Sequence, residues 1–123
     1  MNARILIVDD NVDLAENVAE LLIEEGYQAT SSISPEDAIE KAAIDRYDCI
    51  VLDVRMPGMD GIDLRKELVR TQPSACFVFM TAYACDERLE LAKRSSLGVL
   101  PKPFAPGTLI ELIEQCRAVK RES

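Results

Sequence analysis

Histidine and tryptophan are both absent from the 123 residues of this chain. Without histidine, the chain lacks the commonest general base of enzymes and the usual nitrogen ligand of zinc. Chemistry that depends on a histidine base is therefore excluded, and so is a zinc site with histidine ligands. A reactive group in this protein has to work without an imidazole beside it.

Long apolar runs are also absent, because none approaches the length of about 20 residues that a membrane-spanning helix needs. The chain passes from Arg4 into a short apolar run, residues 5–8, and acidic residues follow at once. This run is too short for a signal peptide. We therefore expect a cytoplasmic protein without a membrane partner.

Basic residues are outnumbered, with 14 Lys and Arg against 22 Asp and Glu and a formal net charge of -8. Non-specific binding to nucleic acid requires a positive field. We therefore expect no direct nucleic-acid binding by this domain, and cations are its more natural partners.

Cysteine is present only four times, and no two cysteines have Cys-x-x-Cys spacing. Cys49 and Cys76 lie in apolar runs. This placement favours reduced cysteines in the core, with a redox or metal role as the open alternative.

Apolar runs alternate regularly with helical patterns along the chain. The length suits one domain, residues 1–123. Strands are expected at residues 5–8, 27–31, 49–52, 75–80 and 98–100. Helices are expected from about Leu14 to Gly26, after the cap residue Ser34, from Gly61, from about Asp86 to Arg94, and from Pro106. Leu14, Val18, Leu21 and Leu22 stand at helical spacing in the first helix, and the residues expected on the inner faces of the later helices are Ala38, Ile39, Ala42, Leu64, Leu68, Leu109, Leu112, Ile113 and Cys116.

Repeated strand–helix units predict the α/β class, a parallel sheet with helices on both faces. Polar residues follow four of the strands: Asp9 and Asp10, then Asp53, Thr81 and Lys102. Because ligands of such sheets bind at the carboxyl ends of the strands, these side chains are predicted to converge. Each residue alone also fits an ordinary role, such as a helix cap, a turn or a solvated loop, so the prediction depends on their convergence.

Three neighbouring carboxylates repel one another, and a hard cation such as Mg²⁺ would make the cluster tolerable. Such a site suits phosphoryl transfer, with Asp53 as the nucleophile and with Lys102 and Thr81 neutralising the phosphoryl oxygens. A carboxylate nucleophile needs no histidine base, which agrees with the composition.

Four motifs stand in order and at fitting intervals: ILIVDDN, DVRMPGMDGIDL, MTAY and LPKPF. Through them, essentially the whole chain resembles a response-regulator receiver domain, the phosphoacceptor module of two-component signalling. The resemblance implies a flavodoxin-like (βα)5 doubly wound fold with strand order 2-1-3-4-5.

The resemblance also implies roles for the metal ligands. Asp9 and Asp10 match the acidic pair of the family, with Asp10 the more direct ligand and Asp9 holding a metal-bound water. Asp53 matches the phosphorylated aspartate, and Arg55 stands where the family offers a backbone carbonyl to the metal. The implied ion is Mg²⁺ or Mn²⁺.

By the same resemblance, Thr81 matches the switch hydroxyl and Lys102 matches the lysine that pairs with the acceptor. A cis bond between Lys102 and Pro103 is often found in the family. Val99 departs from the pattern, because many receivers have Tyr or Phe there, and valine is short and stiff. We therefore expect Thr81 and the loop around residues 83–85 to carry more of the signal.

The implied donor is a sensor histidine kinase or a phosphotransfer protein, and the implied output is an output domain or partner protein on the face made by the fourth helix, fifth strand and fifth helix. A homodimer is possible on that face. The only implied enzymatic activity is self-phosphorylation and self-dephosphorylation. Arg55 and Tyr83, each two residues beyond a functional residue, are expected to slow hydrolysis of the phosphoryl group.

Three alternatives remain open. A Mg²⁺-dependent phosphatase with an aspartyl-phosphate typically has a second aspartate two residues after the nucleophile, where this chain has Arg55. A flavin-binding electron carrier needs a phosphate-binding loop after the first strand, where this chain has acids. A receiver fold that serves as a constitutive protein-interaction module is compatible with Val99.

Overall fold

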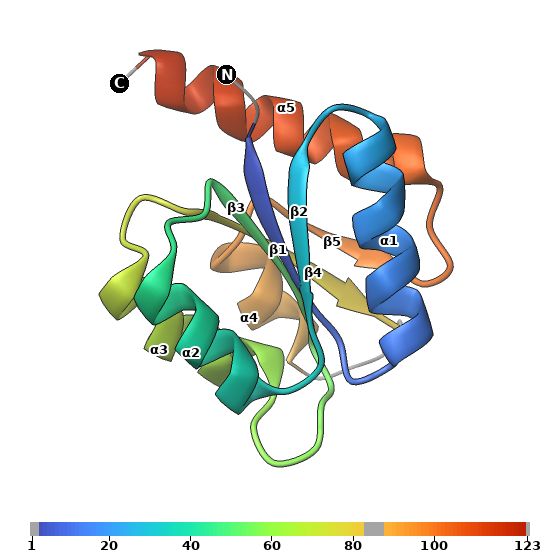
Figure 1. Cartoon of the computed structure of the whole chain (residues 1–123). Helices are drawn as coiled ribbons and strands as arrows, with labels where there is room; N and C mark the ends of the chain where they lie inside the picture. The colour runs from blue at the N-terminus through green and yellow to red at the C-terminus, as the bar shows by residue number, and fades with distance from the viewer. Residues whose placement is uncertain (1–2, 83–87, 123) are drawn as a thin grey trace.

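The computed structural model describes residues 3–82 and 88–122, with side chains as far as residue 119. Within these residues lies a parallel sheet of five strands in the order β2-β1-β3-β4-β5 (Figure 1). The strands are β1 (Arg4–Val8), β2 (Gln28–Ser32), β3 (Cys49–Asp53), β4 (Cys76–Thr81) and β5 (Gly98–Pro101). The predicted fold class and strand order are confirmed.

Helices cover both faces of this sheet. They are α1 (Val12–Glu24), α2 (Pro35–Ile44), α3 (Gly61–Thr71), α4 (Leu89–Arg94) and α5 (Pro106–Glu122). α1 and α5 pack on one face, and α2, α3 and α4 pack on the other (Figure 1). No helix in the described part of the chain has both the length and the apolar character to span a membrane.

The central strand β3 shows why the apolar runs become strands. All five of its residues are buried, and they alternate between the two faces. Ile50 and Leu52 pack under α2 and α3, whereas Cys49 and Val51 pack under α1 and α5. A strand covered on both faces needs a continuous apolar run, which is the pattern read from the sequence.

Two helices begin at residues whose side chains cap them, and one of these, Ser34, was predicted as a cap. The Ser34 hydroxyl accepts a hydrogen bond from the Asp37 N–H at 3.1 Å, and the Asp60 carboxylate accepts one from the Asp63 N–H at 2.9 Å. These side chains satisfy N–H groups that the first turn of a helix leaves without a partner.

The inner face of α1 is made mainly of small residues. Ala15 and Ala19 face the sheet with Leu22, whereas Leu14, Val18 and Leu21 are only partly buried beside α5. Alanine lets the helix lie close to the sheet, and the larger side chains then turn toward the neighbouring helix. On α2, the prediction that Ile39 faces inward is wrong, since it is 37% exposed.

The cysteine prediction is confirmed for Cys49, which is buried and lies outside the disulfide. It is wrong for Cys76, which is partly exposed and forms a disulfide with Cys116, 40 residues away in the sequence. The local apolar pattern contains no information on such a distant pairing. The helix expected from Asp86 to Arg94 corresponds to α4, and Asp86 lies outside the described residues.

Candidate functional site

The carboxyl edge of the sheet brings together residues that were predicted from the strand ends. Asp53 is the last residue of β3, and Thr81 is the last residue of β4. Asp9 directly follows β1, and Lys102 directly follows β5. Because these four strands are neighbours in the sheet, their polar ends face one common site.

Lys102 connects the first strand to the third. Its Nζ donates to Oδ2 of Asp9 at 2.6 Å and to Oδ2 of Asp53 at 3.1 Å. Asp9 is fully buried and Asp53 is 6% exposed, so these charge-assisted bonds lie in a region of low dielectric. The ammonium group therefore fixes the Asp53 carboxylate in position and offsets its charge.

Asp10 completes an acidic cluster with Asp9 and Asp53. One carboxylate oxygen from each lies within 4.8 Å of the others, and Asp10 is exposed while the other two are buried. One ammonium group offsets one of three negative charges, and the remaining charge matches a divalent cation. An all-oxygen donor set of this kind fits Mg²⁺ or Mn²⁺.

The two charged partners at the centre of the site have shifted pKa values. Burial, with the nearby charge of Asp9, raises the pKa of Asp53 to about 6 against the lowering effect of Lys102. Burial lowers the pKa of Lys102, but its bonds to Asp9 and Asp53 outweigh this and leave its pKa above the ordinary value. At neutral pH, Asp53 is therefore mostly an anion and Lys102 a cation, as nucleophilic attack on phosphorus requires.

Helix α3 begins against the backbone of Asp53. The Gly61 N–H donates to the Val54 carbonyl at 2.9 Å, and a Cβ atom on Gly61 would clash with the Asp53 carbonyl oxygen. Only glycine permits so close an approach. The Asp53 Oδ1 also accepts a bond from the Arg55 N–H at 3.3 Å, so both the backbone and the side chain of Asp53 are fixed.

Thr81 and Lys102 are adjacent through the backbone, since the Lys102 N–H donates to the Thr81 carbonyl at 2.7 Å. The Lys102–Pro103 bond is cis, as the resemblance implied. Val99 is partly buried against the core under α2, α3 and α4. Tyr83 and Cys85, to which roles in hydrolysis and switching were assigned, lie outside the described residues.

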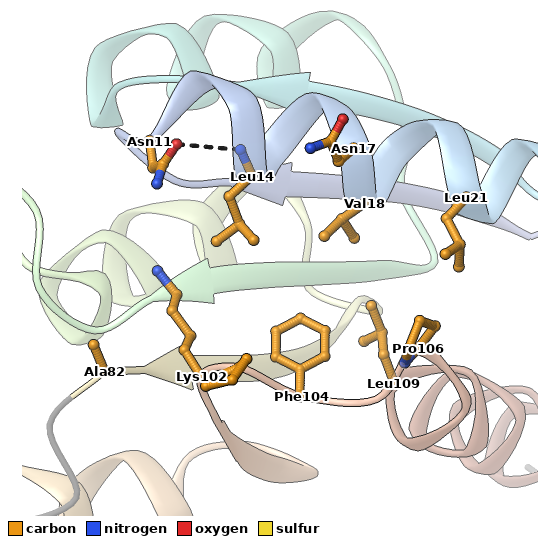
Figure 2. A pocket seen from close by; sticks show the side chains of 11 residues that line it. Asn11, Leu14, Asn17, Val18, Leu21, Ala82, Lys102, Phe104, Pro106 and Leu109 are labelled. Atoms are coloured by element: carbon orange, nitrogen blue, oxygen red, sulfur yellow. Dashed lines mark hydrogen bonds between the residues drawn. The ribbon is translucent and has the colours of Figure 1, made fainter.

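A groove of about 530 Å³ adjoins the site between α1 and the segment that leads into α5. Figure 2 shows Leu14, Val18 and Leu21 on one wall, opposite Phe104, with Lys102 at the end near the acidic cluster. The partial exposure of these three α1 residues gives the site an apolar neighbouring surface.

Sequence reasoning also missed the ion pairs of Arg88. Its guanidinium donates to Asp60 Oδ2 at 2.6 Å and to Asp63 Oδ1 at 3.4 Å. These bonds join the residue before α4 to the first turn of α3. Such a pairing, between side chains more than 20 residues apart, leaves no local signal in the sequence.

Comparison with protein families gives a match to the response regulator receiver domain over residues 5–114. A response regulator receiver protein of Anaeromyxobacter sp. (strain Fw109-5) is 42% identical over 110 residues, which are 89% of this chain and 46% of that protein. The chain spans about half the length of the curated relatives that it matches.

Solved structures agree with this match. A CheY-like receiver domain protein from Methanospirillum hungatei JF-1 superposes with a TM-score of 0.90 over 100% of both chains at 23% identity, which concerns the fold alone. The response regulator TrrA from Thermotoga maritima, in complex with Mg(2+)-BeF, has a TM-score of 0.82 at 31% identity and covers 94% of this chain and 99% of that one.

Proposed function

Because this chain belongs to the response regulator receiver domains of two-component signalling, we propose that Asp53 accepts a phosphoryl group from a phosphohistidine. The donor is a sensor histidine kinase or a phosphotransfer protein. The observation that carries the proposal is the acidic cluster of Asp9, Asp10 and Asp53, with Lys102 bonded to two of its members.

The side chains have separate tasks in this transfer. A carboxylate oxygen of Asp53 attacks phosphorus, the bond from phosphorus to the imidazole nitrogen breaks, and its electron pair stays on that nitrogen. Lys102 keeps its proton and shifts its hydrogen bonds toward the phosphoryl oxygens, whose charge it offsets. The Thr81 hydroxyl at the end of β4 donates to the same group once it has arrived.

Asp9, Asp10 and Asp53, with the Arg55 backbone carbonyl as a further ligand, would hold Mg²⁺ or Mn²⁺ at this site. When bound, the ion neutralises charge on the transferring group. The composition and spacing of the acidic cluster support this assignment, and the TrrA relative was solved in complex with Mg(2+)-BeF. Asp9 and Asp10 therefore serve to hold the cation rather than to react.

The donor protein docks on the groove between α1 and α5. Leu14, Val18 and Leu21 offer it apolar contacts, and Lys102 marks the end of the groove that reaches the acceptor. This placement brings a phosphohistidine to the exposed side of the cluster, where Asp10 meets solvent.

Phosphorylation then shifts a two-state equilibrium that involves β4, α4, β5 and α5, the elements that follow Thr81. We refer to residues 76–116, from β4 into α5, as the output unit. It binds an output domain, a partner protein or a second copy of the chain. The domain acts as an enzyme only toward itself, works in the cytoplasm, and does not itself bind nucleic acid.

The proposal is tested by incubating the protein with Mg²⁺ and acetyl phosphate and then measuring the intact mass. We expect an added mass of about 80 Da in the wild type and none in Asp53→Asn. Glu40→Gln, which neutralises an exposed acid on α2, is the matched control and should gain the same mass as the wild type. Equal phosphorylation of Asp53→Asn would refute the assignment.

A constitutive interaction module is the second candidate, and Val99 is the observation that favours it, since the usual aromatic partner of the switch hydroxyl is missing. The same experiment separates the two. A wild-type protein that gains no mass, while still binding its partner, would support the constitutive module.

A further inference from the structure

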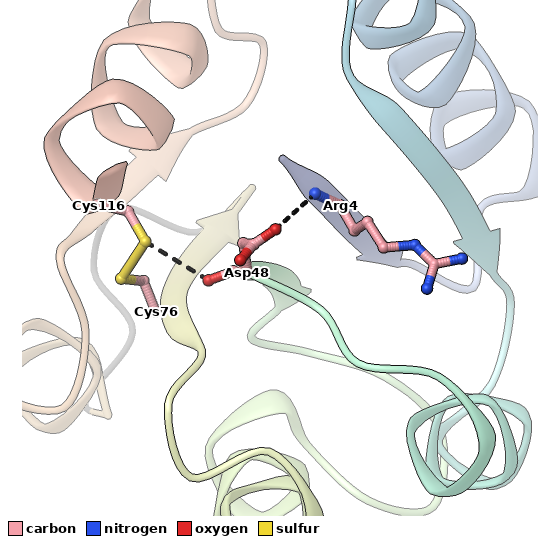
Figure 3. The surroundings of a disulfide bond; sticks show 4 residues. All are labelled: Arg4, Asp48, Cys76 and Cys116. Carbon is pink, nitrogen blue, oxygen red and sulfur yellow. Dashed lines mark hydrogen bonds between the residues drawn. A yellow bond between two sulfur atoms is a disulfide. The ribbon is translucent and has the colours of Figure 1, made fainter. Parts of the chain in front are cut away.

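The disulfide between Cys76 and Cys116 joins the amino end of β4 to the middle of α5 (Figure 3). Their Cα atoms are 6.1 Å apart, a usual separation for a disulfide. The pair lies where β4 begins, whereas the acidic cluster lies beyond its last residue, Thr81. It is therefore a second chemical feature, separate from the phosphoacceptor.

The segment closed by this disulfide is the output unit itself. Residues 76–116 contain all of β4, α4 and β5 and most of α5. Cross-linking its two ends restricts how far α5 can move away from the strand that carries Thr81. The state of the disulfide thus affects the elements to which we assigned the response to phosphorylation.

Asp48 provides an environment that suits both states of the pair. Its carbonyl accepts a bond from the Cys76 N–H at 2.9 Å and lies 3.4 Å from the Cys116 sulfur (Figure 3). A disulfide sulfur has no hydrogen to donate, but a thiol at the same place would donate to this carbonyl. Reduction therefore exchanges a covalent bond for a hydrogen bond, and Cys116 keeps a polar partner.

The two cysteine residues differ in exposure to solvent, since Cys76 is partly exposed and Cys116 is 1% exposed. Attack from solvent is therefore expected at Cys76. Apolar contacts also hold α5 to the sheet, because Leu109 and Ile113 are buried against it. The fold can persist when the disulfide opens.

We infer that Cys76 and Cys116 form a reversible redox site that controls the attachment of α5 to β4. A dithiol reductant supplies the electrons. Its first thiolate attacks the Cys76 sulfur, and Cys116 leaves as a thiolate and takes up a proton. The second thiol of the reductant then displaces Cys76, so the reductant becomes a disulfide and the protein gains two thiols.

This inference goes beyond the proposed function, because it needs neither phosphorus nor Asp53. It agrees with the proposed cytoplasmic location, where disulfides are usually transient and act in catalysis or redox sensing. A purely structural disulfide would be expected to resist reduction in the folded protein.

The first experiment measures reversibility. The folded protein is treated with dithiothreitol or with oxidised glutathione, quenched by alkylation in denaturant, and weighed intact. We expect the reduced sample to carry two more alkyl groups than the oxidised one, and peptide mapping should place the difference at Cys76 and Cys116. Cys49→Ala is the matched control and should keep this difference, whereas Cys116→Ser should lose it.

The second experiment compares amide hydrogen exchange of the oxidised and reduced wild type. We expect exchange in residues 109–119 of α5 to become at least about tenfold faster on reduction, while residues 4–8 of β1 stay unchanged. The double variant Cys76→Ser/Cys116→Ser should match the reduced protein. If it fails to fold, the two wild-type states still decide the question.

Either of two results would overturn the inference. One is a Cys76–Cys116 bond that never forms under oxidation, or that opens only after unfolding. The other is identical exchange in α5 for both states, which would show that the bond does not control attachment of the helix. Neither result depends on whether Asp53 is phosphorylated.

Discussion

The ammonium group of Lys102 lies between two carboxylates that come from different strands, and this placement affects the charge state of Asp53. Burial and the charge of Asp9 both favour a neutral Asp53, and Lys102 opposes them. The pKa of about 6 is the balance of these effects. The acceptor is thus ionised at neutral pH, although it is buried beside another acid.

Replacing Lys102 with alanine should raise the pKa of Asp53 above about 6, because the group that favours its anion is removed. Carbon-13 NMR titration of the Asp53 carboxyl between pH 4 and 9, without divalent metal, measures this shift. Lys93→Ala is the control, since Lys93 is exposed on α4. An unchanged midpoint in Lys102→Ala would show that the ammonium does not set the charge state.

Asp53 also makes stability depend on pH. The pKa of Asp53 rises from 3.8 to about 6 on folding, so its contribution to the free energy of unfolding is fully favourable below pH 3.8, where the carboxyl is protonated in both states. This contribution is lost as pH rises through about 6. Without divalent metal, Asp53→Asn should therefore exceed the wild type in stability at pH 7 by up to about 3 kcal/mol. Urea unfolding at pH 7 and at pH 4 tests this, and the advantage should be much smaller at pH 4.

Gly61 lies where any side chain would strike the backbone of the acceptor. We expect Gly61→Ala to lower the free energy of unfolding by about 1–3 kcal/mol and to slow phosphorylation of Asp53. Gly107→Ala is the matched control, because a Cβ there meets nothing within 4 Å. Urea unfolding and the mass assay measure the two effects, and equal behaviour of both variants would refute the constraint.

At the scale of elements, α1 has two apolar surfaces with different tasks. Ala15, Ala19 and Leu22 attach it to the sheet, and Leu14 and Val18 line the groove beside α5. The groove face is partly exposed, although Val18 also packs against the core. Transfer from a protein and transfer from a small molecule should therefore respond differently to changes there.

Val18→Glu should slow phosphoryl transfer from the cognate kinase about tenfold or more, because a charge replaces an apolar contact. Phosphorylation by acetyl phosphate should be unchanged. Ile23→Glu is the control on the same helix, since Ile23 is 54% exposed and does not line the groove. Equal transfer rates for Val18→Glu and the wild type would place the donor elsewhere.

At the scale of the whole molecule, the acidic cluster should make stability respond to divalent metal. Mg²⁺ at 100 times its dissociation constant should stabilise the fold by about 2.7 kcal/mol and raise Tm by roughly 5–10 °C. Thermal unfolding with Mg²⁺ and after addition of EDTA measures this. The Mg²⁺-induced rise in Tm should be smaller in Asp53→Asn than in the wild type, and in the control Glu40→Gln it should equal that of the wild type. A Tm that does not depend on Mg²⁺ would contradict the metal site.

The sequence predicted the sheet because strands buried on both faces need continuous apolar runs, as in residues 49–52. It predicted which side chains meet because the polar residues, such as Asp53, stand directly after those runs. Contacts between distant segments were not predictable in this way, and the disulfide of Cys76 and the ion pairs of Arg88 are examples. The buried alanines of α1, Ala15 and Ala19, were not singled out because alanine carries a weak apolar signal.

The contact of Gly61 with the backbone of Asp53 has a mechanical consequence. The contact attaches Asp53 to α3, a helix that is separate from the output unit. The Asp53 carboxylate should therefore keep its position while the output unit rearranges. The phosphoryl group would thus be bound at a fixed position, and the signal would depend on movement of the groups that bind it, Thr81 and Lys102.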